Sequence, residues 1–298
     1  MKALVAGWFS FEDMGATAGD LMARDLACAW LTEAGRVWDV ALAPPFAGGV
    51  DWRTVEPSHY ADLVFVCGPF GNGPPVDAML ARFAGCRLIG LDLTMLQPLD
   101  DWNPFDTLYE RDSSAAARPD IAFAADVPRV PVVGMILIHP QPEYGERDRH
   151  RQANDRLRRL LDSREAARMT IDTRLDANGT GLRTAAEIES LIARVDVVVT
   201  TRLHGLVLAL KTGVPVLAID PVRGGAKVTR QAEALGWPLL FQADDATDDA
   251  LQRAFDYCLT GDARAAAHAC RTRAVAAIEL VHRDFVSRLR DVRPVGSR

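Results

Sequence analysis

Three cationic or protonatable side chains follow two strongly apolar segments in the C-terminal half of the sequence. Arg202 and His204 come directly after VDVVVT (195–200), and Lys227 follows VPVLAID (214–220) and a loop with two glycines. A guanidinium, an imidazole and an ammonium group held close together would bind a small anion with more than one negative charge. The alternative is structural: Arg202 and His204 would pair with a carboxylate between domains, and Lys227 would only begin a helix.

These side chains are expected at the carboxyl edge of a parallel sheet. Continuous apolar runs predict strands that are covered on both faces. The buried helix expected between them, 203–212, ends at Gly213 before Pro215. A right-handed crossover makes the two strands parallel, so that their ends meet where ligands of open α/β sheets bind. The two helix starts add free N–H groups that favour an anion, and Thr200 or Thr201 is expected to cap the first helix.

Short apolar runs alternate with helical patterns along the whole chain, which predicts an α/β fold. The expected strands are 2–7, 62–68, 87–93, 130–139, 195–200 and 214–220. The expected helices are about 17–34, 74–84, 146–162, 184–194, 203–212, 226–235 and 247–259. A weak strand followed by two prolines within 122–131 separates two Rossmann-like domains, 1–126 and 127–262. The remainder, 263–298, holds a long helical pattern that is expected to pack back across the first domain.

Composition excludes several classes of protein. The 298 residues carry a formal net charge of −6, so no general attraction to nucleic acid or to an anionic membrane is expected. The arginine-rich stretch 147–168 has leucines at helical spacing and is interpreted as a solvated helix face. No apolar run is long enough to span a membrane, and the first residues do not form a signal peptide, so we expect a cytoplasmic protein. Five scattered cysteines without a CxxC pair predict buried, reduced thiols and no metal site.

The segment VVVTTRLHGLVLALKTGVPVLAID, with Lys227 downstream, resembles the polysaccharide pyruvyl transferase family. The most specific motif of that family is an apolar strand, Arg-Leu-His, a small residue, a buried helix and Gly-Val-Pro-Val. Three weaker matches lie in the expected order: ATAGDLMARDL (16–26), VFVCGPFGNG (64–73) and YERDSSAAARPDIAFAAD (109–126), the last of which contains an Arg-acid-x-Ser element. The chain departs from the family at the asparagine usual before Gly19 and Asp20, and in the second glycine turn.

The resemblance implies two domains in a GT-B-like arrangement, phosphoenolpyruvate as donor substrate and no cofactor. It implies that a pyruvate ketal forms on two hydroxyls of a sugar or glycan, free or lipid-linked, with release of phosphate. The first domain would hold the acceptor and the second the donor. Arg202, Leu203 and Lys227 would contact the donor, and Arg111 would add a further donor contact. His204 would bind phosphate or, as imidazolium, protonate the donor methylene or the departing phosphate.

The acceptor hydroxyls need a general base. Asp20, at the first strand-to-helix turn, and Asp92, near the end of the strand 87–93, both belong to the carboxyl edge of the first sheet and are candidates, although each could instead have only a structural role. His139 ends the first strand of the second domain and is a candidate substrate contact. The aromatic residues at 8, 9 and 11 could stack on a sugar ring or pack against their own domain.

Two other functions fit the same layout. A nucleotide-sugar glycosyltransferase would place a diphosphate near Arg202 and Lys227, and Asp244 or Asp245 could then hold its ribose. A non-catalytic relative would only bind an anion or organise a polysaccharide complex. The sequence leaves the acceptor and the oligomeric state open.

Overall fold

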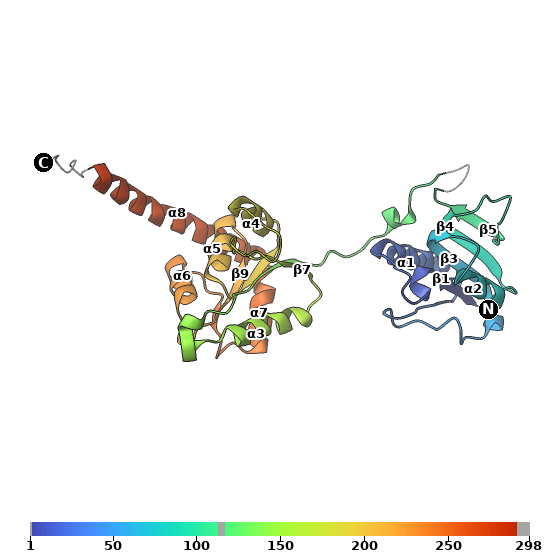
Figure 1. Cartoon of the computed structure of the whole chain (residues 1–298), viewed down its shortest axis with the longest axis horizontal. Helices are drawn as coiled ribbons and strands as arrows, with labels where there is room; N and C mark the ends of the chain where they lie inside the picture. Colours follow the sequence, from blue (N-terminus) through green and yellow to red (C-terminus); the bar gives the residue numbers. More distant parts are fainter. Residues whose placement is uncertain (1, 113–116, 291–298) are drawn as a thin grey trace. The chain divides into compact units, whose positions relative to one another are not determined.

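The computed structural model describes residues 2–112 and 117–290. The chain divides into two compact units, Met1–Pro128 and Arg129–Arg298 (Figure 1). The division lies two residues beyond the boundary that the sequence predicts. Each unit contains a parallel five-stranded sheet with helices, which confirms the α/β fold class.

The sheet of the first unit has the strand order β2-β1-β3-β4-β5. The strands are β1 (Lys2–Ala6), β2 (Trp38–Val40), β3 (Tyr60–Phe70), β4 (Arg87–Met95) and β5 (Thr107–Glu110). Two helices, α1 (Ala18–Glu33) and α2 (Val76–Arg82), and two short 3-10 turns, Trp8–Ser10 and Pro57–His59, lie between these strands, and a third 3-10 turn, Ile121–Ala124, follows β5. The weak strand expected within 122–131 is wrong, because this segment begins as a 3-10 turn in which the amide of Ala122 donates to the Asp120 carboxylate at 2.8 Å.

Successive residues of β3 point to opposite faces of the first sheet and so enter two separate cores. Val64 and Val66 pack in the core with residues of α1, whereas Leu63 and Phe65 pack in the core that contains Met79 of α2. Because both faces are buried, β3 is apolar without alternation, which is the pattern that makes it recognisable in the sequence.

The sheet of the second unit has the order β10-β9-β8-β6-β7. Its strands are β6 (Val132–Ile136), β7 (Ala167–Thr170), β8 (Val197–Thr200), β9 (Val216–Asp220) and β10 (Leu240–Gln242). A further 3-10 segment, Pro142–Arg147, precedes α3. The helices are α3 (His150–Asp162), α4 (Ala185–Ile192), α5 (Leu203–Thr212), α6 (Lys227–Leu235), α7 (Asp248–Cys258) and α8 (Gly261–Arg290). Apolar residues of α4, α5, α6 and the start of α8 share one core, and those of α3 and α7 share another.

The long final helix is buried only at its start. Ala263, Ala267 and Cys270 of α8 are buried, and the helix contacts α5, α6 and α7. The packing of α8 across the first unit stays a prediction. Among the described helices, none is both long enough and apolar enough to cross a membrane.

Candidate functional site

The two segments that carry the cationic side chains end on adjacent strands. β8 and β9 are parallel neighbours, with Thr200 opposite Ala218, and α5 and α6 begin just beyond their carboxyl ends and contact each other. This confirms the topology that the sequence predicts for this edge. Arg202 is half-buried, whereas His204 and Lys227 are exposed. Leu203 is the first residue of α5 and packs at the margin of the core beneath it.

The expected threonine cap of α5 is wrong. The N-cap residue is Arg202, and within residues 2–112 and 117–290 no side chain caps the helix. Thr200 Oγ1 instead donates to the carbonyl of Ile136 at 2.7 Å, and Thr201 Oγ1 donates to Asn154 Oδ1 at 2.7 Å. Both hydroxyls therefore tie β8 to the neighbouring strand and to α3, and the start of α5 keeps its partial positive charge for a ligand.

A glycine allows α5 to begin so close to the sheet. A Cβ atom on Gly205 would lie 2.1 Å from Thr200 Oγ1 and 3.0 Å from Cγ2 of Ile136. Real Cβ atoms do not approach other atoms so closely, so a side chain here would push the helix away from β6 and β8. Gly205 thus helps to set the position of Arg202 and His204 relative to the strand ends.

Arg202 is held by a carboxylate that sequence reasoning missed. Asp172, which follows β7, accepts from Arg202 Nη1 at 3.0 Å through Oδ1, and its Oδ2 lies 3.0 Å from His139 Nε2. Arg202 thus pairs with a carboxylate, but with one of its own unit and not with one between domains, as the structural alternative expects. The sequence does not predict Asp172 as a site residue, because the strand before it, β7, is a short edge strand without a long apolar run.

Burial alone would raise the pKa of Asp172. Its ionised form is stabilised by hydrogen bonds from the amide of Arg174 and from His139 and by the charges of His139 and Arg202, and these effects together are larger than the effect of burial. The pKa of this carboxyl therefore lies below its ordinary value. Asp172 stays ionised at neutral pH and can orient both basic side chains.

The start of α6 differs from that of α5, because a buried carboxylate already accepts hydrogen bonds from its backbone amides. Asp220 Oδ2 accepts from the amides of Ala226 at 2.8 Å and Thr229 at 2.9 Å. The prediction that both helix starts offer free amides is therefore wrong for α6, and Lys227 would have to contact an anion through its side chain. Its Nζ lies 5.9 Å from the centre of the Tyr144 ring.

The loop between Asp220 and Lys227 is held by hydrogen bonds from a residue of another segment. Gly224 and Gly225 have φ angles of 74° and 77°, which glycine adopts without strain. Arg147 donates to the carbonyls of Arg223 and Gly225 at 3.1 and 3.0 Å.

The acidic residues considered for nucleotide binding lie further along the chain. Asp244 accepts from Arg149 at 3.0 Å and from Arg223 at 3.2 Å. Its carboxylate is therefore already paired with two arginines.

Three hollows on the described part of the second unit have linings that do not include Arg202, His204 or Lys227. One hollow, of about 420 Å³, lies over the start of α3, and a second, of about 620 Å³, lies beside Val132 and Asp196. The third lies along α4. The three candidate side chains therefore share a sheet edge rather than one of these hollows.

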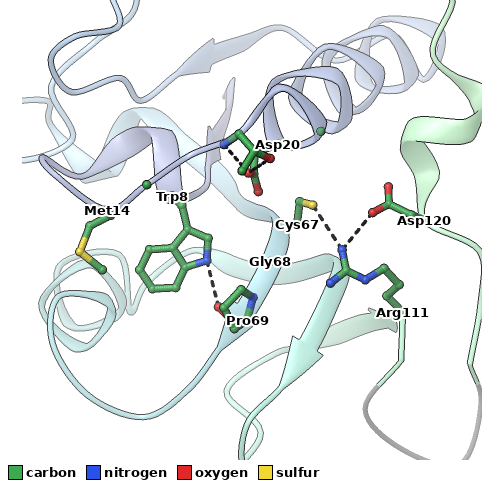
Figure 2. A pocket seen from close by; sticks show the side chains of 11 residues that line it. Trp8, Met14, Asp20, Cys67, Gly68, Pro69, Arg111 and Asp120 are labelled. Carbon is green, nitrogen blue, oxygen red and sulfur yellow. Dashed lines mark hydrogen bonds and ion pairs between the residues drawn. The ribbon is translucent and has the colours of Figure 1, made fainter. Parts of the chain in front are cut away.

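A cavity of about 440 Å³ lies at the carboxyl edge of the sheet in the first unit (Figure 2). Figure 2 shows Trp8 at one side of it, Arg111 and Asp120 at the other, and Asp20 and Cys67 between them. The lining comes from the segment after β1, the start of α1, the last part of β3 and the segment after β5, and consists of Trp8, Met14, Gly15, Thr17, Gly19, Asp20, Cys67, Gly68, Pro69, Arg111 and Asp120.

The aromatic residues after β1 have different positions. Phe9 and Phe11 are buried in the cores of the first unit, as the packing alternative expects. Trp8 lines the cavity, and its Nε1 donates to the carbonyl of Pro69 at 3.0 Å. A Cβ atom on Gly68 would lie 2.6 Å from Cδ1 of Trp8, so the glycine leaves room for the indole.

Asp20 lines the cavity and also performs the structural role considered for it. Its Oδ2 accepts from the amide and from the hydroxyl of Thr17, both at 2.7 Å, in a capping box at the start of α1. Asp92 is 3% exposed and does not line the cavity, and its Oδ2 is one of the buried atoms without a hydrogen bond among the described residues. Burial and the nearby Asp120 raise the pKa of Asp92.

Arg111 lies among acidic groups. Its Nη1 is 3.0 Å from Asp120 Oδ2, 3.9 Å from Asp92 Oδ2 and 3.7 Å from Cys67 Sγ. Cys67, Asp92 and Asp120 have the mutual spacing of metal ligands, but the guanidinium lies against all three and supplies the positive charge there. The Ser114 hydroxyl of the Arg-acid-x-Ser element falls outside the described residues.

The predicted state of the cysteines is confirmed. All five are free and buried. Burial raises the pKa of Cys67 to about 12, with Asp20, Asp92 and Asp120 adding to the effect.

A family model described as polysaccharide pyruvyl transferase matches residues 49–221, which is more than half of the chain. None of the curated proteins matches it. Among solved structures, MurG of Acinetobacter baumannii is 12% identical with a TM-score of 0.34, over 95% of this chain and 100% of that one. Spinosyn rhamnosyltransferase SpnG with spinosyn aglycone is 13% identical with a TM-score of 0.35, over 93% and 96%. The UDP-GlcNAc 2-epimerase of Methanocaldococcus jannaschii is 9% identical with a TM-score of 0.33, over 94% and 100%. Likenesses of this size assign no donor or acceptor to the chain.

Proposed function

Because the chain belongs to the polysaccharide pyruvyl transferase family, we propose that it transfers the pyruvyl group of phosphoenolpyruvate to two hydroxyls of a sugar. The product would be a pyruvate ketal, and phosphate would be released. The observation that carries this proposal is the uncapped start of α5, with Arg202 and His204 on it and Lys227 beyond the adjacent strand. Phosphoenolpyruvate is small and carries a carboxylate and a phosphate, which suit one guanidinium and one ammonium group.

In this proposal Arg202 contacts one anionic group of the donor, and Lys227 contacts the phosphate. The amides at the start of α5 add hydrogen bonds to the same anion. His204 is exposed on the first turn of α5 and would donate the proton that the C3 methylene accepts. The reaction uses phosphoenolpyruvate as a donor substrate and needs no cofactor.

The cavity of the first unit is proposed to hold the acceptor sugar. The Trp8 indole offers an apolar surface for a sugar ring, and the Asp20 and Asp120 carboxylates can accept hydrogen bonds from hydroxyls. Arg111 already forms ion pairs with Asp112 and Asp120. To make its predicted contact with the donor, the guanidinium would have to bind an anionic group of the donor in addition to these two carboxylates. The acceptor would be a repeat-unit sugar of an exopolysaccharide, free or on a lipid carrier, in the cytoplasm.

Thermal unfolding with different ligands tests the donor. A ligand at 100 times its Kd stabilises the folded protein by about 2.7 kcal/mol. We expect phosphoenolpyruvate to raise Tm and a panel of UDP-, GDP- and dTDP-sugars to leave it unchanged. Stabilisation by a nucleotide sugar alone would support glycosyl transfer instead.

Phosphate release tests turnover. We expect the wild-type protein to release phosphate from phosphoenolpyruvate only with an added acceptor, and His204→Ala to lose this activity. If the protein binds phosphoenolpyruvate but releases no phosphate with any acceptor in a broad panel of glycosides, this result would favour a non-catalytic protein that only binds an anion.

A further inference from the structure

His139 has the environment of a catalytic base. It follows β6 at the carboxyl edge of the second sheet, and its side chain is 48% exposed. Its Nε2 lies 3.0 Å from Asp172 Oδ2, while the other oxygen of that carboxylate lies 3.0 Å from Arg202 Nη1. One buried carboxylate therefore links an accessible imidazole to the arginine proposed to bind the donor.

The carboxylate also selects the state of the imidazole. An ionised carboxylate only accepts hydrogen bonds, so Nε2 of a neutral His139 must carry the ring hydrogen. Nδ1 then keeps a lone pair and can accept a proton, and Asp172 stabilises the imidazolium that results. Asp172 is itself fixed, because its Oδ1 also accepts from the amide of Arg174 at 3.0 Å.

We propose that His139 is the general base that deprotonates the acceptor hydroxyl, and that Asp172 is the positioning residue for it. This inference rests on the proposed function. As the hydroxyl oxygen bonds to C2 of phosphoenolpyruvate, its proton passes to Nδ1 of His139, and the C2–C3 electron pair takes a proton at C3 from His204. When the second hydroxyl displaces phosphate from C2, the bond from C2 to the phosphate oxygen breaks, the proton of this hydroxyl passes to His204, and the proton held by His139 goes to the departing phosphate. Over the cycle one hydroxyl hydrogen ends on C3 and the other on phosphate, so both imidazoles return to their starting states.

The two aspartates of the first unit are less suited to this role. Asp20 Oδ2 accepts two hydrogen bonds from Thr17, which would be lost or weakened if the oxygen took up a proton. Asp92 is 3% exposed and is not part of the cavity lining. His139 is both accessible and backed by a carboxylate.

The test compares His139→Ala with the wild-type protein and with His59→Ala, an exposed histidine of the first unit, as the matched control. We expect His139→Ala to lower kcat for phosphate release by about 10²- to 10⁴-fold. The Kd for phosphoenolpyruvate should change less than about 3-fold, because Arg202 keeps its partner. Free imidazole should restore part of the lost turnover, which a merely structural residue would not allow.

Asp172→Asn gives a second measurement, and His139→Gln replaces His139→Ala if the smaller side chain lowers Tm. In the His139→Ala background, Asp172→Asn should reduce turnover far less than it does in the wild-type protein, because the two residues act as a unit.

The inference is overturned if His139→Ala keeps the wild-type kcat, or if it weakens phosphoenolpyruvate binding while kcat is unchanged, which would make His139 a donor contact. A wild-type protein that releases no phosphate from phosphoenolpyruvate with any acceptor would instead remove the proposed function, and the inference with it.

Discussion

The carboxylate of Asp220 accepts the backbone amide hydrogen of Thr229 at 2.9 Å, and so the last residue of β9 is tied to the first turn of α6. The same oxygen accepts from the Thr229 hydroxyl at 2.7 Å and from the amide of Ala226 at 2.8 Å. Asp220 is fully buried. The position of Lys227 therefore depends on a negative charge inside the fold rather than on a free helix start.

Asp220→Asn should destabilise the second unit by about 3 kcal/mol, because an amide nitrogen would replace one acceptor and the remaining bonds would lose their charge. Denaturant titration measures this, with the exposed Asp249→Asn as the control. We also expect weaker binding of phosphoenolpyruvate, since the loop that carries Lys227 would lose its anchor. Unchanged stability would show that Asp220 does not organise the loop.

Gly205→Ala should destabilise the fold by about 1–3 kcal/mol, although alanine is the better helix former. The added Cβ would lie 2.1 Å from Thr200 Oγ1, and α5 would have to move from β8. Gly261→Ala, in the first turn of α8 with no atom within 4 Å of the new Cβ, is the control and should be neutral or stabilising. Thermal unfolding of the two variants compares them, and equal Tm values would contradict the close packing at Gly205.

The structure explains which elements the sequence predicts and which it does not. All six strands predicted from continuous apolar runs form, whereas the weak strand expected within 122–131 does not. Each of the four strands that were missed, β2, β5, β7 and β10, is an edge strand. The missed strands have three or four residues, and most of these are only partly buried. A central strand reveals itself as a continuous apolar run, whereas an edge strand this short carries no such signal.

The candidate site is likewise predicted only in part from the sequence. The motif identifies Arg202, His204 and Lys227, and strand order places them on one edge of the sheet. Their partners are not evident in the sequence, because Asp172 lies 30 positions before Arg202 and follows an edge strand. Likewise Asp120 reaches Arg111 from a separate turn.

Asp92→Asn should stabilise the first unit at neutral pH. The pKa of Asp92 is raised by burial and by Asp120, so the folded state binds its proton more tightly than the unfolded state does. The contribution of this group to stability is therefore full below the unfolded pKa, near 3.9, and is lost as the pH rises through the folded pKa. Arg111 keeps Asp112 and Asp120 as partners in the variant.

Unfolding by urea at pH 3 and pH 7 measures this effect. We expect the stabilisation by Asp92→Asn to be larger at pH 7 than at pH 3, and a smaller effect at pH 7 would contradict the raised pKa. Turnover of the same variant tests the base role considered for Asp92, which predicts a loss of activity.

The cysteines should react slowly in the folded protein. Burial raises the pKa of Cys28 to about 11 and those of Cys67 and Cys258 to about 12, so few of these thiols are ionised at pH 8. We expect iodoacetamide to label all five cysteines quickly in urea and none of these three quickly in buffer, as mass spectrometry would show. Rapid labelling of Cys67 in the folded protein would mean that its thiol is exposed and ionised within the cavity.

Lys227→Ala should separate a structural lysine from one that binds the donor. Lys227 is exposed, and its contact with the Tyr144 ring contributes only about 0.5–1 kcal/mol, so the variant should fold with nearly unchanged Tm. A lost charge-assisted hydrogen bond of about 1.5–3 kcal/mol would weaken phosphoenolpyruvate binding by about 10- to 100-fold. Lys211→Ala is the matched control, because Lys211 is also exposed on a helix and pairs with Glu189. Calorimetric titration of both variants decides the matter: equal Kd values would leave Lys227 with the ordinary role of a lysine at a helix start.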